Sequence, residues 1–247
     1  MMDEKRIKGE VTVDTFFDGR VRVRQDRAGY RFSIDAVVLA HHARAHAGDK
    51  VLDLGTGCGI VSLVMAYRRP AVAVYAVEVQ GELAELARLN VADNQMQDRI
   101  TVLETDMNQL QPSMTSGPVD LVVCNPPYRR RGSGRINPNR QRAVARHEIK
   151  VNLREIIQVA RRMLNPGGRF VTIYAAQRLT DILTRMRHEC LEPKFIRTVH
   201  ADYQADAKLV IVAGTKEARP GLKLASPLFL YDENGDYTAE VQQMFKP

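Results

Sequence analysis

The sequence is poor in cysteine: it has three among 247 residues, Cys58, Cys124 and Cys190, far apart and without a CxxC pair. That number and spacing exclude a disulfide framework and do not match a zinc-binding pattern. We therefore expect no metal site. The three thiols are expected to be small buried or half-buried side chains.

Long apolar runs are also absent. No run approaches the roughly 20 residues that cross a bilayer, and the N-terminal sequence MMDEKRIKGE lacks the apolar core of a signal peptide. We expect no membrane span and a cytoplasmic location. The apolar fraction of 45% and the charged fraction of 26% are those of a globular protein. The length of 247 residues suits one sizeable α/β domain.

Acidic residues are outnumbered by basic ones, giving a formal net charge of +7 and a pI near 9.4. This balance favours a polyanionic partner over an acidic protein partner.

The N-terminal region, residues 1–47, is predicted to be a hairpin followed by one helix. Apolar and polar residues alternate from Val11 to Gln25 on both sides of Asp18-Gly19, a strong turn signal. Ser33 is well placed to cap a helix that runs through Ala40 and ends at Gly48.

From residue 51 onward, short apolar segments alternate with helical ones. Strands are predicted at residues 51–54, 72–77, 100–103, 119–124 and 170–174, and helices at 60–68, 81–94, 153–164 and 179–190. Segments 195–199 and 209–213 lie too close together for a helical crossover, so they should pair antiparallel. This pattern predicts a mostly parallel sheet with helices on both faces. Such sheets bind ligands at the carboxyl ends of their strands.

A glycine-rich turn follows the first of these strands. Gly55 and Gly57 open a helix, where a missing Cβ permits a sharp turn and close approach to a ligand. A dinucleotide-binding fingerprint would need a third glycine where this chain has Ile60. Asp53 inside the strand would repel a pyrophosphate but attract a cation. S-adenosylmethionine, with a sulfonium and an ammonium group, fits this combination.

Two more acids stand at the ends of the next two strands. Glu78 can accept hydrogen bonds from both hydroxyls of a ribose. Asp106 can accept a hydrogen bond from the adenine amine of the same cofactor. Three acids at three successive strand ends, behind a glycine-rich turn, predict a nucleoside-bearing cofactor.

The fourth strand ends in Asn125-Pro126-Pro127-Tyr128, which predicts the reaction. An exocyclic amine is a poor nucleophile because its lone pair is delocalised. The Asn125 side chain and the Pro126 carbonyl could accept its two N–H groups and turn the lone pair toward the methyl group. Pro127 stiffens the turn, and Tyr128 offers a stacking face worth roughly 1–3 kcal/mol for a base. The base would have to be unpaired or flipped. Asn125 is also expected to contact the cofactor.

With these motifs the chain resembles class I Rossmann-like methyltransferases of the NPPY type, over about residues 50–216. The resemblance implies a seven-stranded, mostly parallel sheet with an antiparallel C-terminal strand, and S-adenosylmethionine as cofactor. It implies one methyltransferase domain over residues 1–247, with a core at 48–216 and an extension at 217–247. NPPY-type enzymes include adenine-N6 DNA and RNA enzymes, guanine-N2 rRNA enzymes and release-factor glutamine methyltransferases.

Further segments narrow the resemblance. Residues 29–36, 145–148 and 227–241 are similar to signatures of the bacterial tRNA1(Val) adenine-37 N6-methyltransferase family. This resemblance implies N6-methylation of an adenine in RNA, at a position like 37 of a tRNA, and an RNA partner.

A basic stretch follows the NPPY turn. Between residues 129 and 150 the sequence has eight Lys/Arg residues and one acid, Glu148. Guanidinium groups beside the target pocket suit the phosphates that flank a flipped nucleotide. The residues we expect to contact RNA are Arg129, Arg130, Arg131, Arg135 and Arg146. Arg161, Arg162 and Arg185, on predicted helices, are interpreted as surface charge.

Other functions remain open at this point. A protein glutamine N5-methyltransferase shares the NPPY turn, but such enzymes carry an N-terminal helical domain, whereas only about fifty residues precede the glycine-rich turn here. A DNA adenine methyltransferase usually has an added recognition domain. An rRNA guanine-N2 methyltransferase is a third enzyme alternative. An RNA-binding protein without catalysis is disfavoured because Asn125 to Tyr128 are intact.

Overall fold

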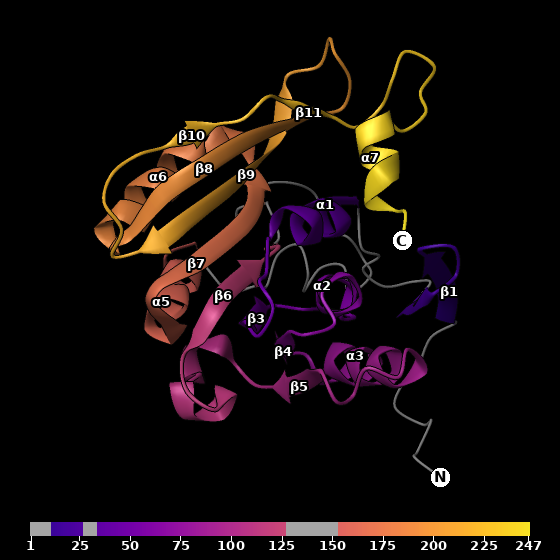
Figure 1. Cartoon of the computed structure of the whole chain (residues 1–247), viewed down its shortest axis with the longest axis vertical. Coiled ribbons are helices and arrows are strands. Elements are labelled where there is room, and N and C mark those ends of the chain that lie inside the picture. The colour runs from indigo at the N-terminus through magenta and orange to yellow at the C-terminus, as the bar shows by residue number, and fades with distance from the viewer. Residues whose placement is uncertain (1–10, 27–33, 127–152) are drawn as a thin grey trace, which may run out of the picture.

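A central twisted sheet organises residues 11–26, 34–126 and 153–247, the part of the chain that the computed structural model describes (Figure 1). Its main strands are β3 (Lys50–Leu54), β4 (Ala73–Glu78), β5 (Ile100–Glu104), β6 (Val119–Cys124), β7 (Leu164–Ala175), β8 (Leu191–His200) and β9 (Ala207–Lys216). They lie in the order β8-β9-β7-β6-β3-β4-β5. Pairs from β5 to β7 are parallel, and β9 is antiparallel to both β7 and β8. The predicted mostly parallel sheet with an antiparallel C-terminal strand is confirmed.

The strand number differs slightly from the prediction. Two short strands, β10 (Lys223–Leu224) and β11 (Leu228–Phe229), add to the edge strand β8 in the described part of the sheet. Both come from the C-terminal extension. A two-residue strand is too short to show an alternating pattern, so the sequence contains no signal for it.

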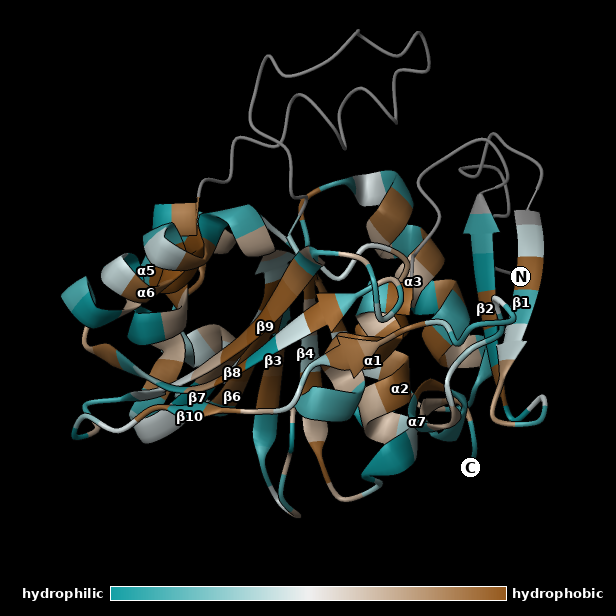
Figure 2. Ribbon diagram, turned by 90° about the horizontal axis from the view of Figure 1, so that it is seen from above, coloured by the Kyte–Doolittle hydropathy of each residue, from teal (hydrophilic) through white to brown (hydrophobic). Residues whose placement is uncertain are grey.

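Helices cover both faces of the sheet. They are α1 (Ile34–His42), α2 (Ile60–Arg68), α3 (Gly81–Asp93), α5 (Leu153–Met163), α6 (Leu179–His188) and α7 (Ala239–Met244), with 3-10 turns η2 (Met107–Gln109), η3 (Pro112–Thr115) and η5 (Ala176–Arg178). Figure 2 shows α5 and α6 on one side of the apolar strands and α1, α2 and α3 on the other. A hydrophobic core lies on each face of the sheet, and successive residues of β6 point into opposite cores. Leu121 and Val123 pack in the core with α1 and α2, whereas Val122 and Cys124 pack in the core with α5.

The predicted N-terminal hairpin is present as β1 (Val11–Phe16) and β2 (Val21–Asp26). Four residues, 17–20, connect the two strands, and Phe17, Asp18 and Gly19 have positive φ angles of 54°, 54° and 81°. Val21 and Val23 of β2 are fully buried in the core that contains α2. The hairpin is therefore packed against the helices and forms no edge of the main sheet.

Three local predictions were wrong. Helix α1 ends at His42, and the Asp49 side chain instead accepts a hydrogen bond from the backbone of His46 at 2.8 Å. The strand predicted at 170–174 begins earlier, since β7 starts at Leu164 and includes residues 165–168, where the register with β6 shifts. Cys190 is exposed at the turn between α6 and β8, whereas the other two cysteines are buried.

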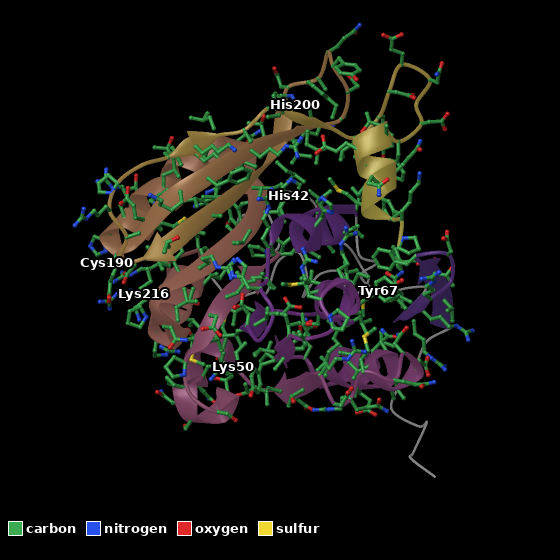
Figure 3. All side chains as sticks on the ribbon, viewed as in Figure 1. His42, Lys50, Tyr67, Cys190, His200 and Lys216 are labelled. Carbon is green, nitrogen blue, oxygen red and sulfur yellow. The ribbon has the colours of Figure 1, made fainter. Side chains whose placement is uncertain are left out.

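The C-terminal extension is tied to the sheet through Arg197 of β8. Its guanidinium contacts both carboxylate oxygens of Glu240 at 2.6 and 2.8 Å and donates to the carbonyl of Ser226 at 2.9 Å. The ring of His42, which α1 directs toward this strand (Figure 3), lies 3.0 Å from the same guanidinium. One half-buried cation thus joins α1, β8 and α7.

Candidate active site

The carboxyl ends of four neighbouring parallel strands meet at one edge of the sheet. Leu54 at the end of β3 faces both Val77 of β4 and Cys124 of β6, and Glu78 faces Glu104 of β5. These strands therefore end at the same level. The residues that follow them belong to four segments distant in sequence, and the fold brings these segments together.

An open pocket lies at this edge, with about 610 Å³ of empty space including its mouth. Of the residues predicted from sequence, Gly55, Glu78, Asp106, Asn125 and Pro126 line it. Its other lining residues are Leu54, Val77, Val79, Gln80, Thr105, Met107, Cys124 and Ile156. The residues that follow or end β3, β4 and β5 thus share one cavity with Asn125 and Pro126.

The glycine-rich turn has the backbone that its sequence implies. Gly55 and Gly57 have φ angles of 71° and 59°, a region that residues with a Cβ rarely adopt. The amides of Gly55 and Thr56 both donate to the carbonyl of Val77 at 2.9 Å. The turn is therefore folded back onto the end of β4, beside Glu78.

Asp53 lies beneath this turn and is absent from the pocket lining. Its side chain is 1% exposed, and its Oδ2 accepts hydrogen bonds from the hydroxyls of Thr56 at 2.6 Å and Ser62 at 2.7 Å. Burial raises the pKa of Asp53 to about 6, against the two hydroxyl hydrogen bonds that lower it. Asp53 supports the turn from behind, and a direct contact with a cofactor stays a prediction.

Glu78 forms the link between the turn and the pocket wall. Its Oε2 accepts from the amide of Gly57 at 2.9 Å and its Oε1 from the amide of Gln80 at 3.0 Å. Burial of the carboxyl raises its pKa above the ordinary range, while these backbone hydrogen bonds lower it. Gly57 does not line the pocket, but its hydrogen bond to Glu78 connects it to a residue that does.

Asp106 begins the 3-10 turn η2 and caps it, since its carboxylate accepts from the amide of Asn108 at 2.8 Å. Arg162 of α5 donates to the carbonyls of Met107 at 3.2 Å and Asn108 at 3.1 Å. Arg162 is exposed, as interpreted from the sequence, and its side chain in addition holds the turn that carries Asp106. Only the spatial proximity of α5 reveals this role.

The backbone just before Asn125 is fixed by both neighbouring strands. The thiol of Cys124 donates to the carbonyl of Leu54 at 3.2 Å, and the hydroxyl of Thr172 donates to the carbonyl of Cys124 at 2.9 Å. Asn125 and Pro126 follow directly and line the pocket. The predicted Pro127, Tyr128, Arg129, Arg130, Arg131, Arg135 and Arg146 lie outside the described residues.

Val79 is the clearest pocket residue that sequence reasoning missed. This apolar side chain is 61% exposed although it lines the cavity next to Glu78. An apolar surface beside two carboxylates suits the face of a flat ring whose edges carry hydrogen-bonding groups. The only signal in the sequence was its position directly after the predicted acid.

In residues 11–26, 34–126 and 153–247, no group of three or more His, Cys, Asp and Glu side chains is arranged to hold a metal ion. Within the same ranges, no helix has the length and apolar character of a membrane span.

Because the pKa of Asp53 is raised by burial, we expect the free energy of unfolding to depend on pH. Its pKa is about 6 in the folded chain and 3.8 ordinarily, so the folded state binds this proton more tightly. Its contribution to folding therefore falls as the pH rises toward and through 6, by about 1–2 kcal/mol between pH 5 and pH 8. Urea unfolding without cofactor should show this loss in the wild type and a smaller one in Asp53→Asn. Parallel pH profiles would contradict it.

The chain belongs to the methyltransferase small domain family, which it matches over residues 31–196. It is 33% identical over 175 residues to a tRNA1(Val) (adenine(37)-N6)-methyltransferase of Porphyromonas gingivalis, covering 68% of each protein. A protein of the same name from Parabacteroides distasonis is 27% identical over 228 residues, 91% of this chain and 92% of the relative. A predicted O-methyltransferase structure from Agrobacterium tumefaciens superimposes with a TM-score of 0.67 at 23% identity, covering 85% and 94%.

These findings establish the class of enzyme. The chain is an S-adenosylmethionine-dependent methyltransferase with a Rossmann-like α/β fold. The cofactor and fold inferred from the sequence are confirmed.

Proposed function

We propose that this enzyme transfers a methyl group to N6 of an adenine in RNA, at a position like 37 of a tRNA. The observation that carries the proposal is the placement of Asn125 and Pro126 in the wall of the pocket that Glu78 and Asp106 also line. The names of the relatives support RNA as the substrate class. The proposed place of action is the cytoplasm, where tRNA is available.

The pocket residues fit the cofactor in charge and shape. The carboxylate of Glu78 would accept hydrogen bonds from the ribose hydroxyls, and that of Asp106 from the adenine amine. Val79 offers an exposed apolar surface for the adenine ring. The positive-φ backbone at Gly55 leaves the pocket wall free of a side chain where the amino-acid part would lie. When bound, the cofactor supplies an electrophilic methyl group on a sulfonium.

The chain's own residues prepare the nucleophile. The Asn125 side-chain oxygen and the Pro126 carbonyl would accept the two N–H groups of the target amine and hold its lone pair in line with the methyl carbon. Methyl transfer to the amine held by Asn125 and Pro126 would form the N–C bond as the C–S bond breaks, and the bonding pair would leave on sulfur. The amine then loses one proton to solvent. Both acceptors follow directly after the end of β6. The reaction then relies on the preorganised alignment of the amine and needs no strong general base.

The basic segment after Tyr128 is proposed to hold RNA phosphates near the pocket mouth. Replacing Arg129, Arg130 and Arg131 together by Gln should weaken binding to all RNAs alike, because phosphate contacts carry no sequence information. Each lost contact should reduce the log–log salt slope by roughly 0.7 to 0.9. Fluorescence anisotropy at several salt concentrations measures both effects, and cofactor affinity should not change.

The matched control replaces three arginines at the other edge of the sheet. Arg161, Arg185 and Arg187 are exposed near the carboxyl ends of α5 and α6. Since β7 starts directly after α5 and runs parallel to β6, these helix ends lie at the amino edge, away from the pocket. Their replacement removes the same charge but should leave the salt slope close to wild type. Equal salt slopes of RNA affinity in the two triple variants would mean that the segment is ordinary surface charge.

The function itself is tested by labelled methyl transfer to four substrates. These are a tRNA1(Val) transcript, the same transcript with guanine at position 37, a DNA duplex, and a release factor with a free glutamine. Nucleoside analysis should find N6-methyladenosine in the first RNA and none in the second. Label in DNA, in protein or on guanine N2 would replace the proposal with the corresponding alternative, and no transfer to any substrate would contradict it.

The hairpin, the core and the C-terminal extension are proposed to form one methyltransferase domain. The burial of Val21 and Val23 against the helices of the core, and the Arg197–Glu240 contact, support this view. A single cooperative unfolding transition, seen equally by fluorescence and circular dichroism, would be its signature.

A further inference from the structure

Asn90 joins two parts of the molecule that are distant in sequence, the N-terminal hairpin and the glycine-rich turn. It lies on α3 and is completely buried. Its Oδ1 accepts from the amide of Arg24 at 2.7 Å, and its Nδ2 donates to the carbonyls of Arg24 at 3.0 Å and Cys58 at 2.8 Å. The amide therefore bonds the N-terminal hairpin and the glycine-rich turn at the same time.

The Cys58 carbonyl is a sensitive position within the turn. It lies between Gly57, whose amide donates to Glu78, and Gly59, which starts α2 with a φ angle of 90° and no side-chain cap. A buried carbonyl without a partner costs free energy comparable to a lost hydrogen bond. Loss of the Asn90 amide would therefore favour a rearrangement of the turn, next to the contact that orients Glu78.

Side-chain amides at the end of α3 bond backbone groups of β2, as a neighbouring strand would. Asn94, one helical turn after Asn90, accepts from the amide of Arg22 at 2.8 Å and donates to its carbonyl at 2.6 Å. The two asparagines thus pair with alternate residues of β2, whose backbone groups point away from β1 in an antiparallel hairpin. Asn94 also donates to the backbone carbonyl of Asn90 at 2.7 Å. Its hydrogen bonds go to Arg22 and Asn90, whereas those of Asn90 include the glycine-rich turn.

Docking of the hairpin does not depend on these amides alone. Val21 and Val23 are fully buried, and Phe17 stacks on Tyr67 of α2 with ring centroids 4.5 Å apart (Tyr67 is labelled between α2 and the hairpin in Figure 3). These apolar contacts stabilise the hairpin on the core. What Asn90 adds is a polar connection from the docked strand to the turn at the cofactor pocket.

We propose that Asn90 is a positioning residue of the cofactor site, which couples docking of the N-terminal hairpin to the conformation of the glycine-rich turn. Cofactor binding and hairpin docking then stabilise each other, because the coupling of two equilibria is reciprocal. The proposal concerns the cofactor half of the site and does not depend on which base is methylated.

The first test uses the wild-type chain and S-adenosylhomocysteine. Hydrogen exchange of the Arg22 and Arg24 amides should slow on the order of fivefold or more when this ligand saturates the pocket, although both amides lie on the hairpin. Unchanged exchange of both amides would contradict the coupling without any substitution.

The second test compares Asn90→Ala with Asn94→Ala. By calorimetry, Asn90→Ala should bind S-adenosylhomocysteine on the order of fivefold or more weakly, and the ligand should no longer slow exchange in β2. Asn94→Ala should lower the basal protection of the Arg22 amide, yet keep near-normal affinity and the ligand-dependent slowing. Asn90→Ser, which leaves a smaller hole, serves the same comparison if Asn90→Ala unfolds.

The comparison separates coupling from general packing. Equal losses of affinity in the Asn90 and Asn94 variants would mean that both act only by weakening the hairpin, and the proposal would fail. It would also fail if Asn90→Ala kept both wild-type affinity and ligand-dependent exchange. Since the readout is ligand binding without RNA, a wrong RNA substrate would leave these results unchanged.

Discussion

Replacement of Asn125 by alanine is expected to lower the single-turnover rate of methyl transfer by about 10²–10³-fold, the cost of removing one preorganised hydrogen-bonding group. The side-chain oxygen is proposed to accept an N–H of the target amine as its nitrogen becomes pyramidal. Alanine leaves only the Pro126 carbonyl for this task. The lone pair then stays delocalised into the ring, and the amine remains a poor nucleophile.

Cofactor affinity separates this role from a structural one. The carbonyl of Cys124 is bonded to the Thr172 hydroxyl, and its thiol to the carbonyl of Leu54, so the end of β6 is held without the Asn125 side chain. Calorimetry should therefore give near-normal S-adenosylmethionine binding for Asn125→Ala. Asn125→Asp is the control, because it keeps an acceptor at the same place and should retain more activity. Near-normal turnover of the alanine variant would refute the acceptor mechanism.

The sequence predicted the sheet well because its strands are short apolar runs between turn signals. β6 and α2 have the predicted bounds, since each is delimited by glycine or proline. Prediction failed at residues 165–168, which lie inside β7 and not between the helix and the strand, and where the register shifts. These residues have no partner on β6, since the register passes from Val119–Leu164 to Leu121–Arg169. Such a bulge depends on the neighbouring strand, which the local sequence does not reveal.

The site could be predicted to the level of strand ends but not to the level of contacts. Glu78 and Asp106 were found because a parallel sheet places successive strand ends at one edge. The burial of Asp53 beneath the turn could not be found, because it depends on the hydroxyls of Thr56 and Ser62. Arg162 and Asn90 act through helices packed from elsewhere in the chain, so neither carries a local motif.

Glu78 should make the largest contribution of any side chain to cofactor affinity. Its two carboxylate oxygens already hold the amides of Gly57 and Gln80, and they face the pocket where ribose hydroxyls are proposed to donate. Hydrogen bonds to a charged acceptor contribute roughly 1.5–3 kcal/mol each. Glu78→Ala is therefore expected to weaken S-adenosylmethionine binding by about 10²-fold or more in calorimetry, and Glu78→Gln, which keeps one acceptor oxygen, by less.

Glu104 provides the matched control, because it faces Glu78 across the β4–β5 pair yet lies outside the pocket lining. Its exposed carboxylate pairs with Arg88 at 3.1 Å, an interaction that contributes little at a surface. Glu104→Ala removes the same charge from the same sheet edge, so a general electrostatic effect on the cationic cofactor would appear in both variants. We expect near-normal affinity for Glu104→Ala. If Glu78→Ala also bound normally, Glu78 would have no ribose role; if both lost affinity equally, the effect would be charge at the strand ends rather than hydrogen bonding by one carboxylate.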